Sequence, residues 1–202
     1  MKLYDNPRGQ NPKRVRMFLA EKGVEIPLVN VDLMNYEQLS DDYLQVNSLG
    51  RVPVLELDDG TRLTESIGIC RYLETIYPEP NLFGTDPVEV AEIEMWTRRL
   101  ELEVNMHVTN MMRHSSPFFA KTMVQVPEMV EASKKMLGRR LAWLDDELGD
   151  REFIAGDRYT MADIVGWAGL LMIPILKYDV DPSLTNYLRW IETISTRPNA
   201  DA

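Results

Sequence analysis

The chain has 202 residues, of which 45% are hydrophobic, so it can bury one large core or two small ones without disulfides or structural metals. Its single cysteine, Cys70, excludes an internal disulfide framework and a multi-cysteine metal site, and it suits a reducing compartment, so we expect a cytoplasmic protein. A net charge of -10 argues against nonspecific nucleic-acid binding, and the absence of a signal-peptide pattern and of a long apolar stretch argues against secretion and a membrane span.

Positive charge gathers at the start of this acidic chain. Residues 1–22 carry six basic and two acidic side chains, a surplus of four positive charges. This pattern has two interpretations, a solvated helix face or a binding site for an anion.

The first elements form a strand-helix-strand unit. We predict a strand over residues 2–5, then a helix with Asn11 as its N-cap and Pro12 at its first position. Gly23 ends this helix, and the apolar run 26–31 predicts a second strand. Such a connection makes the two strands parallel.

A hairpin and a third element follow. Strands are predicted over 54–57 and 62–64, because Asp59-Gly60 between them is a strong hairpin signal. Ser66 is predicted to cap a helix that Pro78 closes. A mixed sheet with helices on its faces is the α/β thioredoxin-like arrangement.

The second part of the chain predicts helices only. We expect a domain over 1–78, a proline-rich linker over 79–87 and an all-α helical bundle domain over 88–202. Thr160 and Asp163 match the capping-box pattern of a helix start. Apolar spacing places the four helices at 88–114, 127–148, 160–177 and 182–196.

Two motifs resemble those of one known family. The segment Asn47 to Leu55, followed by Leu63 to Ile67, is similar to the glutathione-site signature of cytosolic glutathione transferases. The segment Phe153 to Asp157, with Thr160 and Asp163, resembles the capping box in that family's helical domain. The resemblance implies a homodimeric detoxification enzyme that uses glutathione as its co-substrate and needs no metal.

The resemblance also assigns a binding site for glutathione. Val52 precedes Pro53, which the family holds in cis, so that the Val52 backbone can pair with the cysteinyl part of glutathione. Ser66 and the start of its helix would bind the γ-glutamyl carboxylate, and Glu65 would pair with the ammonium. The alternative for Glu65-Ser66 is a plain helix cap.

Two further contacts are implied by position alone. Gln38 and Arg51 fall where the family often places contacts to the glycyl carboxylate and the peptide backbone of glutathione.

The residue that activates the thiol departs from the family pattern. Gly9 stands where relatives carry Ser or Cys, so the usual hydroxyl or thiol is absent. We choose Asn11 as the thiolate donor because its amide N–H groups can point at sulfur, although Asn11 also suits an N-cap. Gln10, Arg8 and a backbone amide near Gly9 are the reserves.

The helix from residue 88 carries the candidates for the electrophile pocket. His107, Met111 and His114 follow one another at spacings of four and three, on a stripe that borders this pocket in the family. Two histidines without further ligands make a poor metal site, so we expect no metal.

Conjugation of the glutathione thiolate to small hydrophobic electrophiles is therefore the leading function. The alternatives are a glutathione-dependent disulfide reductase or peroxidase, and a noncatalytic scaffold that binds protein partners. An enzyme disulfide is not expected, because Gly9 cannot form one and Cys70 lies on an apolar helix stripe.

Overall fold

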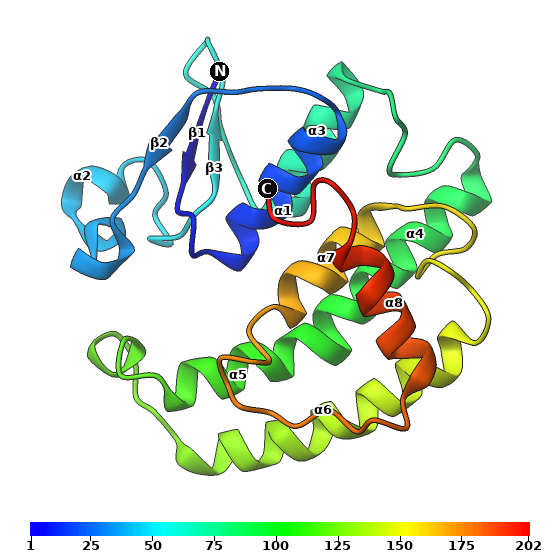
Figure 1. The fold of residues 1–202 in the computed structure, drawn as a ribbon. Helices are drawn as coiled ribbons and strands as arrows, with labels where there is room; N and C mark the ends of the chain where they lie inside the picture. Colours follow the sequence, from blue (N-terminus) through cyan, green and yellow to red (C-terminus); the bar gives the residue numbers. More distant parts are fainter. The chain divides into compact units, whose positions relative to one another are not determined.

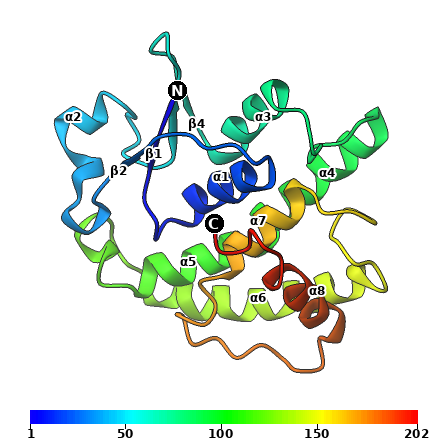
Figure 2. The same cartoon turned by 45° about the horizontal axis from the view of Figure 1, so that its top comes forward.

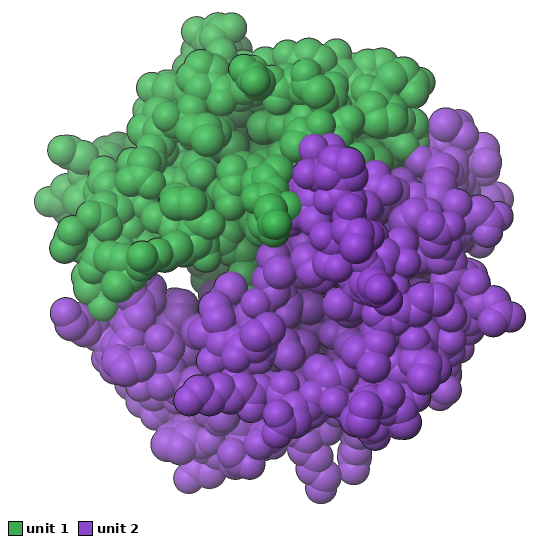
Figure 3. Space-filling view, viewed as in Figure 1, with its two compact units in different colours: residues 1–82, 201–202 green, residues 83–200 purple.

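The structure, a computed structural model, describes residues 1–202 as two compact units. The first unit comprises residues 1–82 with 201–202, and the second comprises residues 83–200 (Figure 3). The predicted linker, 79–87, spans the boundary between them.

A four-stranded mixed sheet organises the first unit (Figure 1). Its order is β2-β1-β3-β4, in which β1 pairs parallel with β2 and antiparallel with β3, and β3 pairs antiparallel with β4. This arrangement confirms the predicted thioredoxin-like sheet and its hairpin. The strands are β1 (Lys2–Asp5), β2 (Leu28–Asn30), β3 (Val54–Glu56) and β4 (Arg62–Thr64).

Two helices, α1 (Gln10–Glu21) and α3 (Ser66–Ile76), pack together on one side of this sheet (Figures 1 and 2). Phe18, Cys70 and Leu73 are fully buried there, so Cys70 is the buried small hydrophobe that we expected. Three short elements that the sequence did not predict follow β2, with α2 on the other side of the sheet from α1 and α3 (Figure 1). They are η1 (Leu33–Asn35), η2 (Glu37–Leu39) and α2 (Asp41–Leu44).

The start of α1 differs from the prediction. Gly9, not Asn11, is the N-cap, and the first helical hydrogen bond runs from the Lys13 N–H to the Gly9 carbonyl over 3.0 Å. Pro12 is the third helical residue, where it is tolerated because the first N–H groups of a helix have no helical acceptor. The Asn11 side chain therefore plays no part in capping.

Two other boundaries in this unit also move. The second strand covers Leu28–Asn30 instead of 26–31, because Pro27 has no N–H to donate to the sheet. Ser66 is the first residue of α3 and not its cap, a position that Glu65 takes without a side-chain bond.

The second unit contains only helices, which confirms the all-α prediction (Figure 2). Its first helices form one continuous path whose middle is a π-helical segment that the sequence did not reveal. None of the helices is long and apolar enough to cross a membrane. The elements are α4 (Pro87–Arg99), the π-helical η3 (Leu100–Asn105), α5 (Met106–Ser115), η4 (Phe119–Lys121), α6 (Pro127–Leu148), α7 (Met161–Leu170) and α8 (Thr185–Ser195).

Proline explains most of the boundary errors in this unit. Helix α4 begins at Pro87 because the first helical position tolerates proline, and Asp86 caps it. Helix α7 ends at Leu170 rather than at residue 177, and Pro174 cannot supply the N–H that would continue it. Helix α8 begins at Thr185 rather than at residue 182, after a turn that the Asp181 carboxylate closes.

The predicted capping box at the start of α7 is present and fully buried. The Asp163 carboxylate accepts the backbone N–H of Thr160 at 3.0 Å and that of Ile154 at 2.9 Å. It also accepts the indole N–H of Trp190 at 2.9 Å. One side chain thus joins α7, the preceding loop and α8.

Replacing Asp163 with Ala should lower the free energy of unfolding by about 3 kcal/mol, because three buried N–H donors lose their acceptor. All four tryptophans lie in the second unit, so urea unfolding followed by tryptophan fluorescence measures this loss. Asp157→Ala, at an exposed position in the same loop, is the control and should change little. Equal effects of the two substitutions would contradict the role assigned to Asp163.

Candidate functional site

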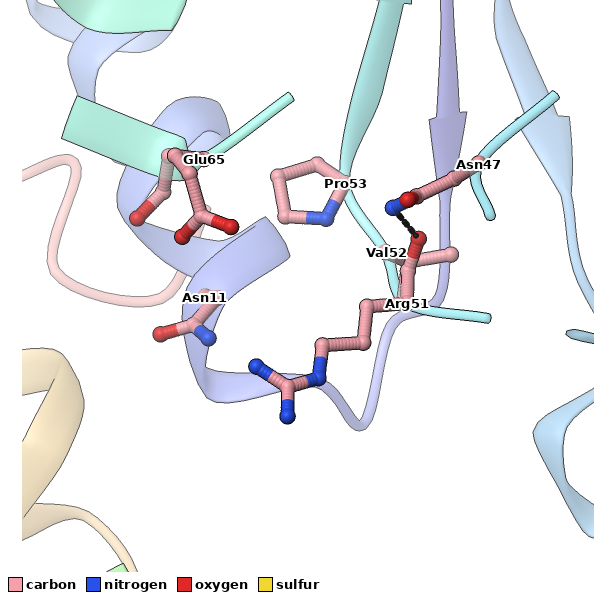
Figure 4. A pocket seen from close by; sticks show the side chains of 7 residues that line it. Asn11, Asn47, Arg51, Val52, Pro53 and Glu65 are labelled. Carbon is pink, nitrogen blue, oxygen red and sulfur yellow. Dashed lines mark hydrogen bonds between the residues drawn. The ribbon is translucent and has the colours of Figure 1, made fainter. Parts of the chain in front are cut away.

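A polar groove in the first unit brings most of the predicted site residues together (Figure 4). It lies where the N-terminal ends of α1 and α3 meet the segment that leads into β3. Six of its residues are predicted contacts, and Asn47 is an addition. The lining residues are Asn11, Asn47, Arg51, Val52, Pro53, Glu65 and Ser66.

The backbone at Arg51 and Val52 forms the sheet side of the groove. The Arg51 carbonyl accepts the Asn47 side-chain amide at 2.8 Å and the Tyr43 hydroxyl at 3.0 Å. The Val52–Pro53 peptide bond is cis, as the resemblance implies. The N–H and C=O of Val52 make no hydrogen bond within the protein. An extended peptide can therefore pair with them as an added strand would.

Asn47 belongs to the motif, but the sequence did not predict it as a site residue. It is 7% exposed, and its side-chain oxygen also accepts the Leu49 N–H at 3.0 Å. The signal in the sequence was the Asn-Ser-Leu-Gly turn, in which an Asn side chain commonly bonds to the backbone two residues on.

The start of α3 forms the other side of the groove. Glu65 is exposed and has φ 64° and ψ 118°, a conformation that costs a residue with a side chain about 1–3 kcal/mol. Ser66 is 5% exposed. The helical hydrogen bond to the Glu65 carbonyl comes from the Ile69 N–H, at 2.9 Å. The N–H groups of the first turn thus have no helical acceptor and favour an anion.

Arg14 contacts Ser66, and the sequence did not predict this contact. This guanidinium is 6% exposed, and its Nη1 donates to the Ser66 hydroxyl oxygen at 3.4 Å. The signal in the sequence was the positive surplus of residues 1–22, but nothing in that segment singles out the one arginine that turns inward.

Asn11 reaches the groove from the second residue of α1. Its side chain is exposed and makes no hydrogen bond within the protein, and the Arg51 guanidinium extends toward the same side of the groove (Figure 4). The amide N–H groups of Asn11 are therefore available to a ligand. Arg8 and Gln10, the reserve candidates, do not line the groove.

Gly9 lacks a side chain for a steric reason. A Cβ atom at this position would lie 2.7 Å from Cγ and 2.8 Å from Cδ of Pro12. Carbon atoms do not approach so closely without repulsion. The proline ring therefore excludes a serine or cysteine at position 9 unless the loop shifts.

Gln38 does not line the groove. It is 8% exposed, and its side-chain oxygen is buried without a hydrogen-bond partner. Gly50 packs against its backbone, since a Cβ on Gly50 would lie 2.8 Å from the Gln38 carbonyl oxygen. A contact between Gln38 and a ligand stays a prediction.

The predicted electrophile residues lie on α5 in the second unit. His107 is half-buried, and burial together with the nearby Arg140 guanidinium holds the pKa of His107 below its usual range. Met111 is 3% exposed, and Nδ1 of His114 accepts the Val126 N–H at 3.0 Å. Their role in a pocket stays a prediction.

The titratable side chains provide neither a metal site nor a reactive cysteine. No group of three or more His, Cys, Asp or Glu side chains is arranged to hold a metal ion. Burial raises the pKa of the Cys70 thiol well above its usual value, so this sulfur is not a nucleophile at neutral pH.

Comparison with protein-family models gives two matches. Residues 1–75 match the model described as "Glutathione S-transferase, N-terminal domain". Residues 103–198 match "Glutathione S-transferase, C-terminal domain".

Full-length relatives carry the same description. The chain is 34% identical over 209 residues to glutathione S-transferase 2 of Saccharomyces cerevisiae, covering 98% of this chain and 87% of that protein. It is 29% identical over 200 residues to GstA of Escherichia coli O157:H7, covering 98% and 94%.

Two solved structures share the fold. The crystal structure of Gtt2 from Saccharomyces cerevisiae superposes with a TM-score of 0.93 at 33% identity, covering 99% of this chain and 98% of the other. A glutathione S-transferase domain-containing protein of Marinobacter aquaeolei gives 0.93 at 35% identity, covering 99% and 100%.

The close approach of Pro12 to Gly9 predicts that a serine introduced at position 9 is not accommodated. Gly9→Ser should lower the free energy of unfolding by about 1–3 kcal/mol through overpacking. It should also lower kcat/KM with glutathione, because the start of α1 has to shift. The double variant Gly9→Ser with Pro12→Ala removes the clash and should recover most of the stability. A fully stable and more active single variant would contradict this account.

Proposed function

We propose, from the premise that this chain belongs to the glutathione S-transferase family, that the groove of its first unit binds and activates glutathione. The chain is a glutathione S-transferase, an enzyme that joins the glutathione sulfur to an electrophile. The relatives do not favour a scaffold or a disulfide reductase. The observation that carries the proposal is the convergence of Asn11, the Val52 backbone and Glu65-Ser66 on one groove.

Glutathione is an extended tripeptide with two carboxylates, one ammonium and one thiol. Its cysteinyl part pairs with the N–H and C=O of Val52, which have no partner within the protein. Its γ-glutamyl carboxylate lies at Ser66 and the first turn of α3, and its ammonium pairs with the Glu65 carboxylate. Arg51, which lines the groove, serves the glycyl carboxylate, whereas Gln38 lies outside the groove.

Asn11 stabilises the thiolate. A free thiol has a pKa of roughly 8.5, so an enzyme working at neutral pH gains from a donor that bonds only to the sulfur anion. The Asn11 amide meets the requirement because capping does not engage it and it faces the groove. The thiol loses its proton to water, and the thiolate attacks the electrophilic carbon to form a C–S bond. In a substitution the leaving group departs with the electrons of its bond, and in an addition the resulting anion takes a proton from water.

The electrophile is a small hydrophobic molecule held by side chains of α5. His107 has a lowered pKa and is neutral at pH 7, so it offers this molecule a polar group without a charge. Met111 and His114 complete the proposed set. We place the enzyme in the cytoplasm, where glutathione conjugation serves detoxification.

Replacing Asn11 with Ala should raise the pKa of bound glutathione by about one unit, since only the thiolate gains from the donated hydrogen bond. The pH profile of kcat/KM should shift to higher pH by the same amount, while affinity for the S-methyl analogue stays nearly unchanged. Asn11→Asp keeps the side-chain shape but places a negative charge beside the sulfur, so turnover at neutral pH should collapse.

The two Asn11 variants separate the proposed role from other outcomes. Because Gly9 caps α1, neither variant should destabilise that helix through loss of a cap. An Asp variant with the wild-type pH profile would exclude Asn11 as the donor. Titration of the wild type that detects no glutathione binding at about millimolar concentration would overturn the groove itself.

The protein should form a twofold dimer through the helices that begin at α4. Met95, Leu102 and Met106 are 39%, 46% and 45% exposed at spacings of seven and four along these helices. Leu102→Glu should shift sedimentation equilibrium toward monomer, whereas Leu188→Glu on α8, 38% exposed in wild type, should not. A wild-type chain that stays monomeric at every concentration would contradict the dimer.

A further inference from the structure

Arg14 is a buried cation in direct contact with the proposed carboxylate site. It sits one turn after Gln10 on α1, is 6% exposed, and donates from Nη1 to the Ser66 hydroxyl oxygen at 3.4 Å. Removing a guanidinium from water is unfavourable, so a buried arginine is stable only where it contacts acceptors such as the Ser66 hydroxyl oxygen. Arginine stays protonated in proteins, so the positive charge behind Ser66 is permanent.

The bond from Arg14 decides where the Ser66 proton points. A serine hydroxyl carries one donor and two acceptor sites, and a guanidinium has donors only. Because Arg14 occupies an acceptor site of Oγ, the O–H of Ser66 has to turn away from Arg14. Ser66 lines the groove, so that proton is available to a ligand there.

The neighbouring cations of α1 are engaged elsewhere. Arg16 pairs with the Asp5 carboxylate at 2.6 Å, and Lys13 lies 3.9 Å from Asp201. Neither lines the groove. Among these three basic residues of α1, Arg14 is therefore the one that places positive charge at the start of α3.

We propose that Arg14 is a positioning residue for the γ-glutamyl carboxylate of glutathione, because it holds the Ser66 hydroxyl as a donor toward that carboxylate. The contact forms a chain from the Arg14 guanidinium through the Ser66 hydroxyl to the carboxylate, and each bond polarises the next. This inference rests on the proposed glutathione site and extends it by one residue that does not touch the ligand.

The test compares two ligands that differ only in this carboxylate. One is glutathione, and the other is the analogue in which 4-aminobutyrate replaces the γ-glutamyl residue and so lacks the carboxylate. Arg14→Gln should weaken glutathione binding about tenfold or more, the usual worth of a hydrogen bond to a charged group, and should leave affinity for the analogue nearly unchanged. Isothermal titration measures both dissociation constants.

Two matched variants exclude a general effect of charge or of folding. Lys13→Gln removes a positive charge from the same turn of α1 without contacting Ser66, and should change either affinity less than about twofold. In the background of Ser66→Ala, Arg14→Gln should have little further effect on glutathione binding, since the chain is already broken.

Several outcomes would overturn the inference, and they can be told apart. If Arg14→Gln weakens both ligands by the same factor, or adds fully to Ser66→Ala, Arg14 is only structural and the inference is wrong. Should Arg14→Gln fail to fold, Arg14→Lys provides the same comparison: it should lose part of the preference for glutathione over the analogue, and an unchanged preference overturns the inference. A wild type that binds glutathione without any such preference overturns the carboxylate site as well, and one that binds neither ligand overturns the proposed function.

Discussion

Two buried cations, Arg14 and Lys22, hold α1 alongside α3, and the arrangement of the groove residues depends on these contacts. Arg14 bonds to Ser66 near the start of both helices, and Lys22 pairs with Glu74 at 2.6 Å near their ends. Both pairs are separated by eight residues along their helices, from 14 to 22 and from 66 to 74. The Lys22 side chain is fully buried and also donates to the Pro80 carbonyl at 2.6 Å. The two helices therefore cannot slide past one another without breaking a buried charged contact.

The fixed alignment of α1 and α3 gives the groove its chemistry. It holds the amide of Asn11 and the first turn of α3 on the same opening, while the sheet supplies the Val52 backbone from a third direction. The lining includes the Arg51 guanidinium and the Glu65 carboxylate, with Arg14 behind Ser66. Both kinds of charge are needed for a ligand that carries carboxylates and an ammonium.

Patterns among residues that are close in the sequence predicted most of the fold and part of the site. Asp59-Gly60 fixes its hairpin, and Thr160 with Asp163 fixes a helix start, because the residues that interact are neighbours in the chain. The motif around Val52 and Glu65 likewise gave five of the seven groove residues, and the start of α1 gave Asn11. Such features need no knowledge of the rest of the structure.

Features that depend on distant contacts were not predictable in this way. The π-helical segment places Asn105 against α7, where its amide donates to the Val165 carbonyl at 2.9 Å, and a Cβ on Gly169 would lie 2.1 Å from the Asn105 side chain. Spacing along one helix cannot report that contact. The inward turn of Arg14 was hidden for the same reason, since its partner is 52 residues away.

The close approach of Pro12 to Gly9 also bears on how this lineage can change. A serine or cysteine at position 9 meets the proline ring, so the order in which substitutions arise matters. A side chain introduced at position 9 overpacks while Pro12 is present, and loss of Pro12 alone adds no functional group to the loop. Positions 9 and 12 are therefore coupled, so a side chain at position 9 is accommodated only together with a change at position 12 or a shift of the loop.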